Sequence, residues 1–235
     1  MIGFFSILAI GFFLGMRHAT DPDHVVAVTT IVSRQSKPSR AALTGLFWGI
    51  GHTLTILVVG AAIILFGVVI PARVGLSMEF SVALMLILLG IINVVAFMRS
   101  AAPHSHPHSD ETALPALDRL FGRVTMYRHL RPLLIGIVHG LAGSAAVALL
   151  VLATIRDAKW AIAYLLLFGL GTVAGMMLIT MSIASAFSFF GRRPGFRGRL
   201  AFASGLISLA FGLLLVYQIG FAGGLLTGHP QWTPR

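Results

Sequence analysis

The sequence predicts an all-α polytopic membrane protein whose six transmembrane helices form two inverted repeats of three. Three observations lead to this fold class. Hydrophobic residues make up 57% of the 235 positions and charged residues 10%, whereas a soluble domain carries about 25% charged residues. The apolar residues gather in six long segments separated by polar connections. Motifs of the first half of the chain recur, in the same order, in the second half.

Each of the six apolar segments is long enough for one membrane crossing, which takes about 20 helical residues. They cover residues 2–32, 41–70, 80–98, 132–155, 160–190 and 200–226. The first is too long for one straight crossing and contains Pro22, which has no N–H group and disrupts a helix. We therefore expect a broken first helix, with non-helical backbone that lines a cavity or is buried in protein.

Basic residues are distributed unevenly between the connections. The first, third and fifth connections together carry twelve lysines and arginines, while the other connections and the C-terminal tail carry four. Because cytoplasmic loops are enriched in basic residues, this predicts a bacterial inner-membrane protein with both termini outside the cytoplasm. The net charge of +10 thus reflects topology in a lipid bilayer and does not indicate a nucleic-acid partner. The absence of cysteine excludes disulfides and thiolate metal sites.

The internal repeat relates the two halves of the chain. Residues 15–19 (GMRHA) align with residues 136–140 (GIVHG) without a gap, and residues 47–52 (FWGIGH) align with residues 167–172 (LFGLGT). Three helices per repeat is an odd number, so the second repeat is expected to lie inverted in the membrane. Inverted repeats with broken helices at their interface are typical of secondary transporters.

This repeat divides the chain into three parts. Residues 1–98 form the first three-helix repeat, residues 99–131 a cytoplasmic loop, and residues 132–227 the second repeat. The loop contains His104, His106 and His108, and such a histidine tract either binds metal weakly or is a polar loop without a specific role.

Residues 17–24 (RHATDPDH) form the strongest candidate site. Five ionisable side chains lie within eight positions, flanked by uncharged apolar sequence, and each charge near the bilayer centre costs roughly 2.5–3.5 kcal/mol. Imidazole and carboxylate groups together suit a divalent transition-metal ion. The candidate ligands are His18, Asp21, Asp23 and His24. The alternatives are a proton relay and a structural salt bridge that uses Arg17.

Two further histidines lie in apolar segments. His52 follows Gly49 and Gly51, small residues that permit close helix packing, and His139 is the counterpart of His18 in the repeat. Each is either a metal ligand, or a group that supports one, or an ordinary buried histidine with a hydrogen-bonded partner.

At these motifs the chain resembles the nickel/cobalt transporter family, called NiCoT or NicO. That family is marked by an H-x4-D-H motif in an early helix, here within residues 17–24, and by Gly-His-Ser/Thr on the next helix, here residues 51–53. The resemblance implies permeation of a divalent metal, Ni²⁺ or Co²⁺, as cargo, with no resident cofactor. It also implies that the metal is held by His18, Asp23 and His24, with His52 nearby.

The longer members of the family have about eight spans and acidic motifs in later helices, and this chain has neither. Its residues 139–144 (HGLAGS) look more like the shorter, six-span UreH-type relatives, which are associated with nickel supply to urease. The resemblance therefore implies a permease, an accessory protein that passes nickel to cytoplasmic nickel-handling proteins, or a metal efflux protein. An enzymatic role is not expected, because H-E-x-x-H is absent and no glutamate lies near the motif. The direction of transport, the coupling ion and the oligomeric state stay open.

Overall fold

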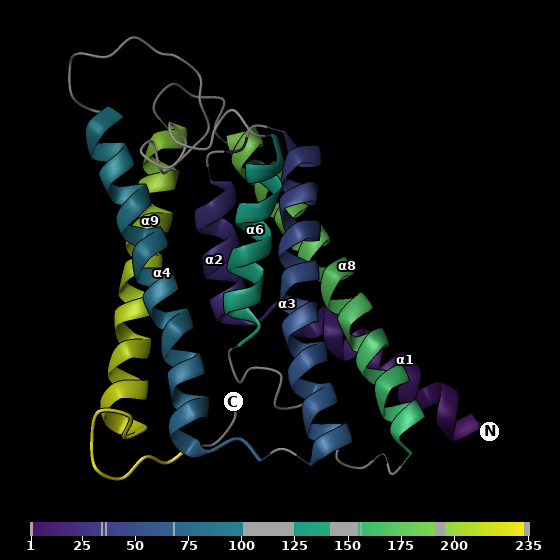
Figure 1. Ribbon diagram of the computed structural model, residues 1–235. Helices are drawn as coiled ribbons and strands as arrows, with labels where there is room; N and C mark the ends of the chain where they lie inside the picture. Colours follow the sequence, from purple (N-terminus) through teal and green to yellow (C-terminus); the bar gives the residue numbers. More distant parts are fainter. Residues whose placement is uncertain are drawn as a thin grey trace.

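Figure 1 shows the computed structural model, which describes residues 2–33, 35, 37–67, 69–100, 125–141, 155, 157–190 and 196–232. Within these residues every regular element is a helix. The elements are α1 (Ile2–His18), α2 (Pro22–Val32), α3 (Pro38–Phe66), α4 (Ala72–Ser100), α6 (Thr125–His139), α8 (Ala158–Phe190), α9 (Phe196–Tyr217) and the π-helical turn η2 (Gln218–Ala222).

The break predicted in the first apolar segment is present between α1 and α2. Pro22 occupies the first turn of α2, a position where its missing N–H group costs nothing. The residue before a proline is excluded from the helical conformation, and Asp21 is accordingly extended, with φ −60° and ψ 146°. Tight-turn bonds close the break, from the Thr20 N–H to the Arg17 carbonyl (2.8 Å) and from the Asp21 N–H to the His18 carbonyl (3.0 Å).

Four helices in the described part of the chain are long and apolar enough to cross a membrane. They cover Pro38–Phe66, Ala72–Arg99, Ala158–Phe190 and Gly198–Ala222. Three shorter apolar helices accompany them, at Ser6–His18, Pro22–Val32 and Leu130–His139. The molecule is thus built like a helical membrane protein in which long spans surround half-length helices.

The helix ends differ in places from the predicted segments. α4 begins at Ala72, eight residues before the predicted segment, because the helix continues through Arg73 and Glu79 at the polar end of the span. α6 begins at Thr125, within the connection predicted for residues 99–131. The fourth predicted segment is described as far as residue 141, and residues 142–154 lie outside the described part.

The helices pack in pairs with close backbone contacts (Figure 1). α3 packs on α8 and α4 on α9, while α1 lies against α8 and α6 against α3. Glycines permit the closest crossings, because Gly15 of α1 lies directly against Phe168 of α8, and Gly136 of α6 directly against Trp48 of α3. α2 lies between these groups and contacts α4, α8 and α9.

The two ends of the helix bundle differ in the chain segments that they carry. In Figure 1 the C-terminal ends of α2, α4 and α8 lie at the top, together with the N-terminal ends of α3, α6 and α9. The N-terminal end of α1, the α3–α4 connection and η2 lie at the lower end. The connections predicted to be cytoplasmic therefore emerge at one end of the bundle, and α1 starts at the other.

Candidate metal centre

The first group of predicted ligands meets at the end of α1. His18 is the last residue of α1, and its ring is 4% exposed. Its Nδ1 lies 2.8 Å from Asp21 Oδ2, and its Nε2 lies 2.9 Å from His52 Nε2 of α3. The break at Pro22 turns Asp21 back toward the end of α1, and so one imidazole is held between a carboxylate and a second imidazole.

The second group of predicted ligands meets at the start of α2. Asp23 Oδ1 lies 3.1 Å from His24 Nδ1, and Asp23 Oδ2 lies 3.1 Å from His139 Nε2 at the end of α6. His24 and His139 are fully buried, and the Asp23 side chain is 16% exposed. One carboxylate therefore joins the first half of the chain to the second.

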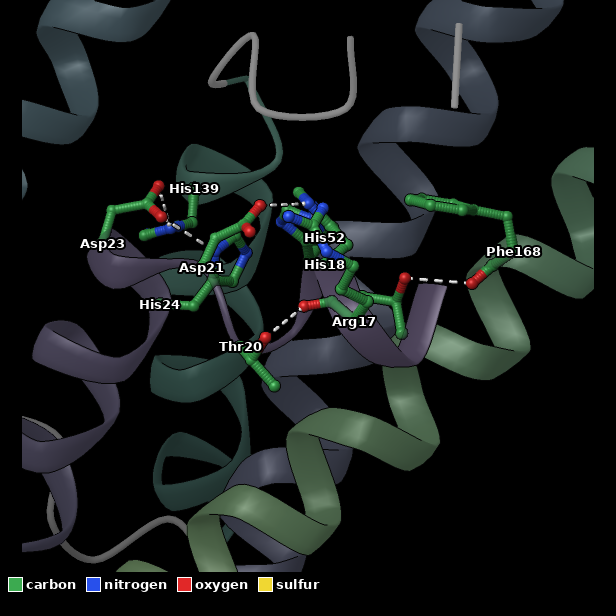
Figure 2. A network of polar contacts seen from close by, with 10 residues as sticks. Arg17, His18, Thr20, Asp21, Asp23, His24, His52, His139 and Phe168 are labelled. Atoms are coloured by element: carbon green, nitrogen blue, oxygen red, sulfur yellow. Dashed lines mark hydrogen bonds and ion pairs between the residues drawn. The ribbon is translucent and has the colours of Figure 1, made fainter. Parts of the chain in front are cut away.

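The two groups form one cluster at the break between α1 and α2 (Figure 2). The His24 ring centroid lies 4.2 Å from that of His139, 4.7 Å from that of His18 and 4.9 Å from that of His52. All six residues predicted from the sequence thus lie in a single network supplied by α1, α2, α3 and α6. His24 is at its centre.

Two sets of three residues have ligand atoms within 4.8 Å of one another. One is His18, His24 and His52, and the other is Asp23, His24 and His139. Within the described part of the chain, three buried ring nitrogens of the cluster have no hydrogen-bond partner, namely His24 Nε2, His52 Nδ1 and His139 Nδ1. A buried polar atom without a partner is costly, and a lone pair on such a nitrogen is available to a metal ion.

Comparison with known proteins places this chain in a family. The profile of the high-affinity nickel-transport proteins, NicO, matches residues 4–191. The chain belongs to the NicO family. The resemblance seen in residues 17–24 and 51–53 is thereby confirmed for most of the chain.

Two relatives of this NicO protein match over nearly its whole length. A protein named urease accessory protein UreH, from Bacillus sp. (strain TB-90), is 39% identical over 220 residues, which cover 94% of each chain. A protein named chloroplast protein FOR GROWTH AND FERTILITY 2, from Arabidopsis thaliana, is 25% identical over 92% of this chain and 57% of its own. No solved structure gives a significant match.

The family and the first of these relatives define the broad class of the molecule. It is a multi-pass helical membrane protein of a nickel-transport family, with a non-enzymatic role. This agrees with the expectation drawn from the motif.

Trp48 is a member of the site in this NicO protein that the sequence did not single out. It is fully buried and nearly parallel to the His24 ring, with centroids 6.0 Å apart and planes inclined at 22°. It also meets His139 edge-on at 5.4 Å. The sequence did contain a signal for Trp48, because it lies four residues before His52 and residues four apart share a helix face.

Thr172, which the predicted repeat aligns with His52, does not join the cluster. Thr172 is fully buried, and its hydroxyl donates to the Phe168 carbonyl of its own helix at 2.9 Å.

Asn93, in the predicted third span, donates hydrogen bonds to α2, as expected of a lone polar residue within a span. The histidines at positions 104, 106 and 108 and the small residues after 141 lie outside the described residues.

Proposed function

We propose that this NicO protein is a secondary transporter that moves Ni²⁺ or Co²⁺ across a bacterial inner membrane. The observation that carries the proposal is the cluster of four imidazoles and two carboxylates, held by α1, α2, α3 and α6 where the first span is interrupted. His18, Asp21, Asp23, His24, His52 and His139 are the proposed metal ligands. The ion is the cargo, and no resident cofactor is required.

The chemistry of the cluster suits a transition metal better than a harder cation. Imidazole is a favoured ligand of nickel, cobalt, copper and zinc, whereas magnesium and calcium favour oxygen ligands. Two imidazole nitrogens that bind one ion at about 2.1 Å lie roughly 3 Å apart when their bonds meet at a right angle. The 2.9 Å between the Nε2 atoms of His18 and His52 is close to that separation, and the two carboxylates supply two negative charges to balance a divalent ion.

The proposed architecture is six spans in two inverted repeats, with residues 1–98 and 132–227 as the repeats and residues 99–131 as a cytoplasmic loop. Equivalent residue pairs support it. Gly51 of α3 lies against Leu133 of α6, and Gly171 of α8 lies against Phe12 of α1. Gly171 lies 120 residues after Gly51, and Leu133 lies 121 residues after Phe12, so the proposed repeat relates the first pair to the second. Exchange of equivalent contacts in this way is expected of two repeats related by a pseudo-two-fold axis.

In this architecture the ion lies between the repeats. The first repeat supplies five of the proposed ligands and the second supplies His139. We propose that both termini are extracytoplasmic, since α1 begins at the end of the bundle opposite the basic connections. Transport then proceeds by movement of one helix group against another around the site, driven by an ion gradient or by a partner.

A second candidate function is supported by the relative named urease accessory protein UreH. In that case the cluster captures nickel and passes it to cytoplasmic nickel-handling proteins, without catalysing flux by itself. Metal binding is common to both candidates, and so only flux separates them.

The deciding experiment is a flux assay in liposomes that contain purified protein and a trapped metal-sensitive dye. If the protein is a transporter, Ni²⁺ or Co²⁺ should enter these liposomes in a saturable manner. No such entry should occur in empty liposomes or in liposomes that contain the His24→Ala variant. An accessory protein would bind nickel in dialysis but give the flux of empty liposomes. Cell-associated nickel, compared with and without the protein, then distinguishes uptake from efflux.

A further inference from the structure

The metal cluster is divided between helices that belong to two differently packed groups. His18, His52 and His139 are on α1, α3 and α6, whereas Asp23 and His24 are on α2. α3 packs on α8 and on α6, and α1 packs on α8, while α4 and α9 form a second pair on the far side of α2 (Figure 1). The position of α2 therefore decides whether the two ligand sets meet.

α2 has few constraints along its own chain. It has eleven residues, and it is separated from α1 by the non-helical residues 19–21. An isolated helix of this length is marginal, so it takes its position from tertiary contacts. The last carbonyls of any helix also lack partners within the helix, and at this end of α2 Thr30 and Ser33 are buried in protein.

Asn93 of α4 meets this need at the C-terminal end of α2. Its side chain is 2% exposed, and its Nδ2 group donates to the Thr30 carbonyl at 2.8 Å and to Ser33 Oγ at 3.2 Å. The Thr30 hydroxyl adds a bond to the Ser204 carbonyl of α9 at 3.3 Å. The free end of α2 is thereby tied to both members of the α4–α9 pair.

The close approach of α9 to Asn93 depends on a glycine in α9. Gly205 of α9 passes so close that an added Cβ would lie 2.9 Å from Asn93 Cβ. A larger residue at position 205 would separate α9 from α4 and move the amide away from α2. The three helices therefore converge on this amide group.

We propose that Asn93 is a positioning residue, which fixes α2 to the α4–α9 pair and so holds Asp23 and His24 against His52 and His139. This inference rests on the proposed metal-binding function of the cluster. Asn93 does not touch the ion. It acts through the helix that carries two of the ligands, so that a movement of the α4–α9 pair carries those ligands with it.

The test compares Asn93→Leu with a matched control. Leucine has the same number and branching of side-chain heavy atoms as asparagine but no donor group, and so it removes both bonds to Thr30 and Ser33. Ser208→Ala removes a different buried bond of the same helix pair, from the Ser208 hydroxyl to the Leu86 carbonyl at 2.8 Å, without touching α2. Ser33→Ala removes one Asn93 bond together with the local bond from the Ser33 hydroxyl to the Thr30 carbonyl at 3.0 Å, and it is a small change if the leucine variant does not fold.

The first measurement is hydrogen exchange of the intact protein without metal, followed by mass spectrometry. Asn93→Leu should speed exchange in the peptide that covers α2, Ser33→Ala should do so to a smaller extent, and Ser208→Ala should leave α2 at the wild-type rate. Unchanged exchange of α2 in both Asn93→Leu and Ser33→Ala would overturn the proposal.

The second measurement is Ni²⁺ affinity by equilibrium dialysis of the same proteins. We expect binding about tenfold weaker in Asn93→Leu, because α2 is then no longer held in the position that presents its ligands, and within about twofold of wild type in Ser208→Ala, because the Ser208 bond does not reach α2. Faster exchange of α2 with unchanged affinity would show that α2 need not be held for binding, and would also overturn the proposal. If the wild-type protein bound no Ni²⁺, the proposed function would fail, and the exchange data would still decide whether Asn93 holds α2.

Discussion

At the residue scale, the site depends on a single carboxylate that joins two helices. Asp23 contacts His24 of its own helix and His139 of α6, each at 3.1 Å. It is the only carboxylate within the two three-residue ligand sets of the described chain. Among the proposed ligands, Asp23 is therefore the one whose loss should weaken the binding of a divalent ion most.

We expect Asp23→Asn to abolish Ni²⁺ binding while the protein still inserts, since asparagine keeps the size of aspartate but not its charge. His139→Ala should weaken binding by about tenfold without abolishing it, because His24 and Asp23 stay in place. Isothermal titration of the two purified variants checks both expectations. Equal losses in the two variants would show that His139 is as essential a ligand as Asp23.

Trp48 gives a second test at this scale. Trp48→Ala should lower the free energy of unfolding by about 3–5 kcal/mol, the usual cost of emptying a large aromatic site, and should also impair metal binding by releasing the His24 ring. Trp48→Phe should be much milder, since the indole N–H has no hydrogen-bond partner among the described residues. Thermal unfolding with and without Ni²⁺ measures both effects. A phenylalanine variant as unstable as the alanine variant would contradict this account.

At the element scale, short helices carry the ligands and close crossings hold them in place. The end of α6 is set by Gly136, which lies against the backbone of Trp48, and by Gly140, which lies beside the His52 carbonyl. The Thr55 hydroxyl also donates to the Ile137 carbonyl at 3.0 Å. These contacts place His139 beside α3 although the half-helix is too short to be held by the membrane alone.

Gly136→Ala should therefore reduce metal binding strongly. An added Cβ would lie 2.7 Å from Trp48 Cδ1 and closer still to the Trp48 carbonyl, so α6 must move away from α3 and take His139 with it. Gly67→Ala is the matched control. Gly67 has φ +62° and open space around it, and so alanine there costs about 1–2 kcal/mol of stability but should leave metal affinity unchanged. Equilibrium dialysis measures the Ni²⁺ affinity of the two variants. Normal binding by Gly136→Ala would show that α3 and α6 can move apart without loss of the site.

At the scale of the whole molecule, the proposed orientation rests on the charge distribution and on the directions of the helices. The basic connections emerge at one end of the bundle, and η2 lies at the other (Figure 1). Because the chain contains no cysteine, single introduced cysteines report the location of each end without background.

We expect Gly228→Cys to react with a membrane-impermeant maleimide added to spheroplasts, and Lys37→Cys to react only after the membrane is permeabilised. Both positions are exposed, and Gly228 has nothing within 4 Å of an added Cβ. The unsubstituted protein is the control for labelling without cysteine. Labelling of Lys37→Cys in intact spheroplasts would reverse the proposed topology.

The sequence by itself determined the helical membrane class, the break at Pro22 and the residue types of the candidate site. These features are local. Long apolar runs must form helices in lipid because every backbone group needs a partner, and proline interrupts a helix whatever surrounds it. The family motif in residues 17–24 is equally local, and His139 was found because residues 136–140 match residues 15–19 in a short run.

Only the tertiary structure decided which side chains meet and what holds them together. The contacts of His18 with His52, and of Asp23 with His139, join residues 34 and 116 positions apart, and no local pattern encodes such distances. The stacking of Trp48 on His24 and the Asn93 contact with α2 depend on how far each helix approaches its neighbours. That approach is set by glycines packed against backbone on other helices, and so it emerges only when all the helices are assembled.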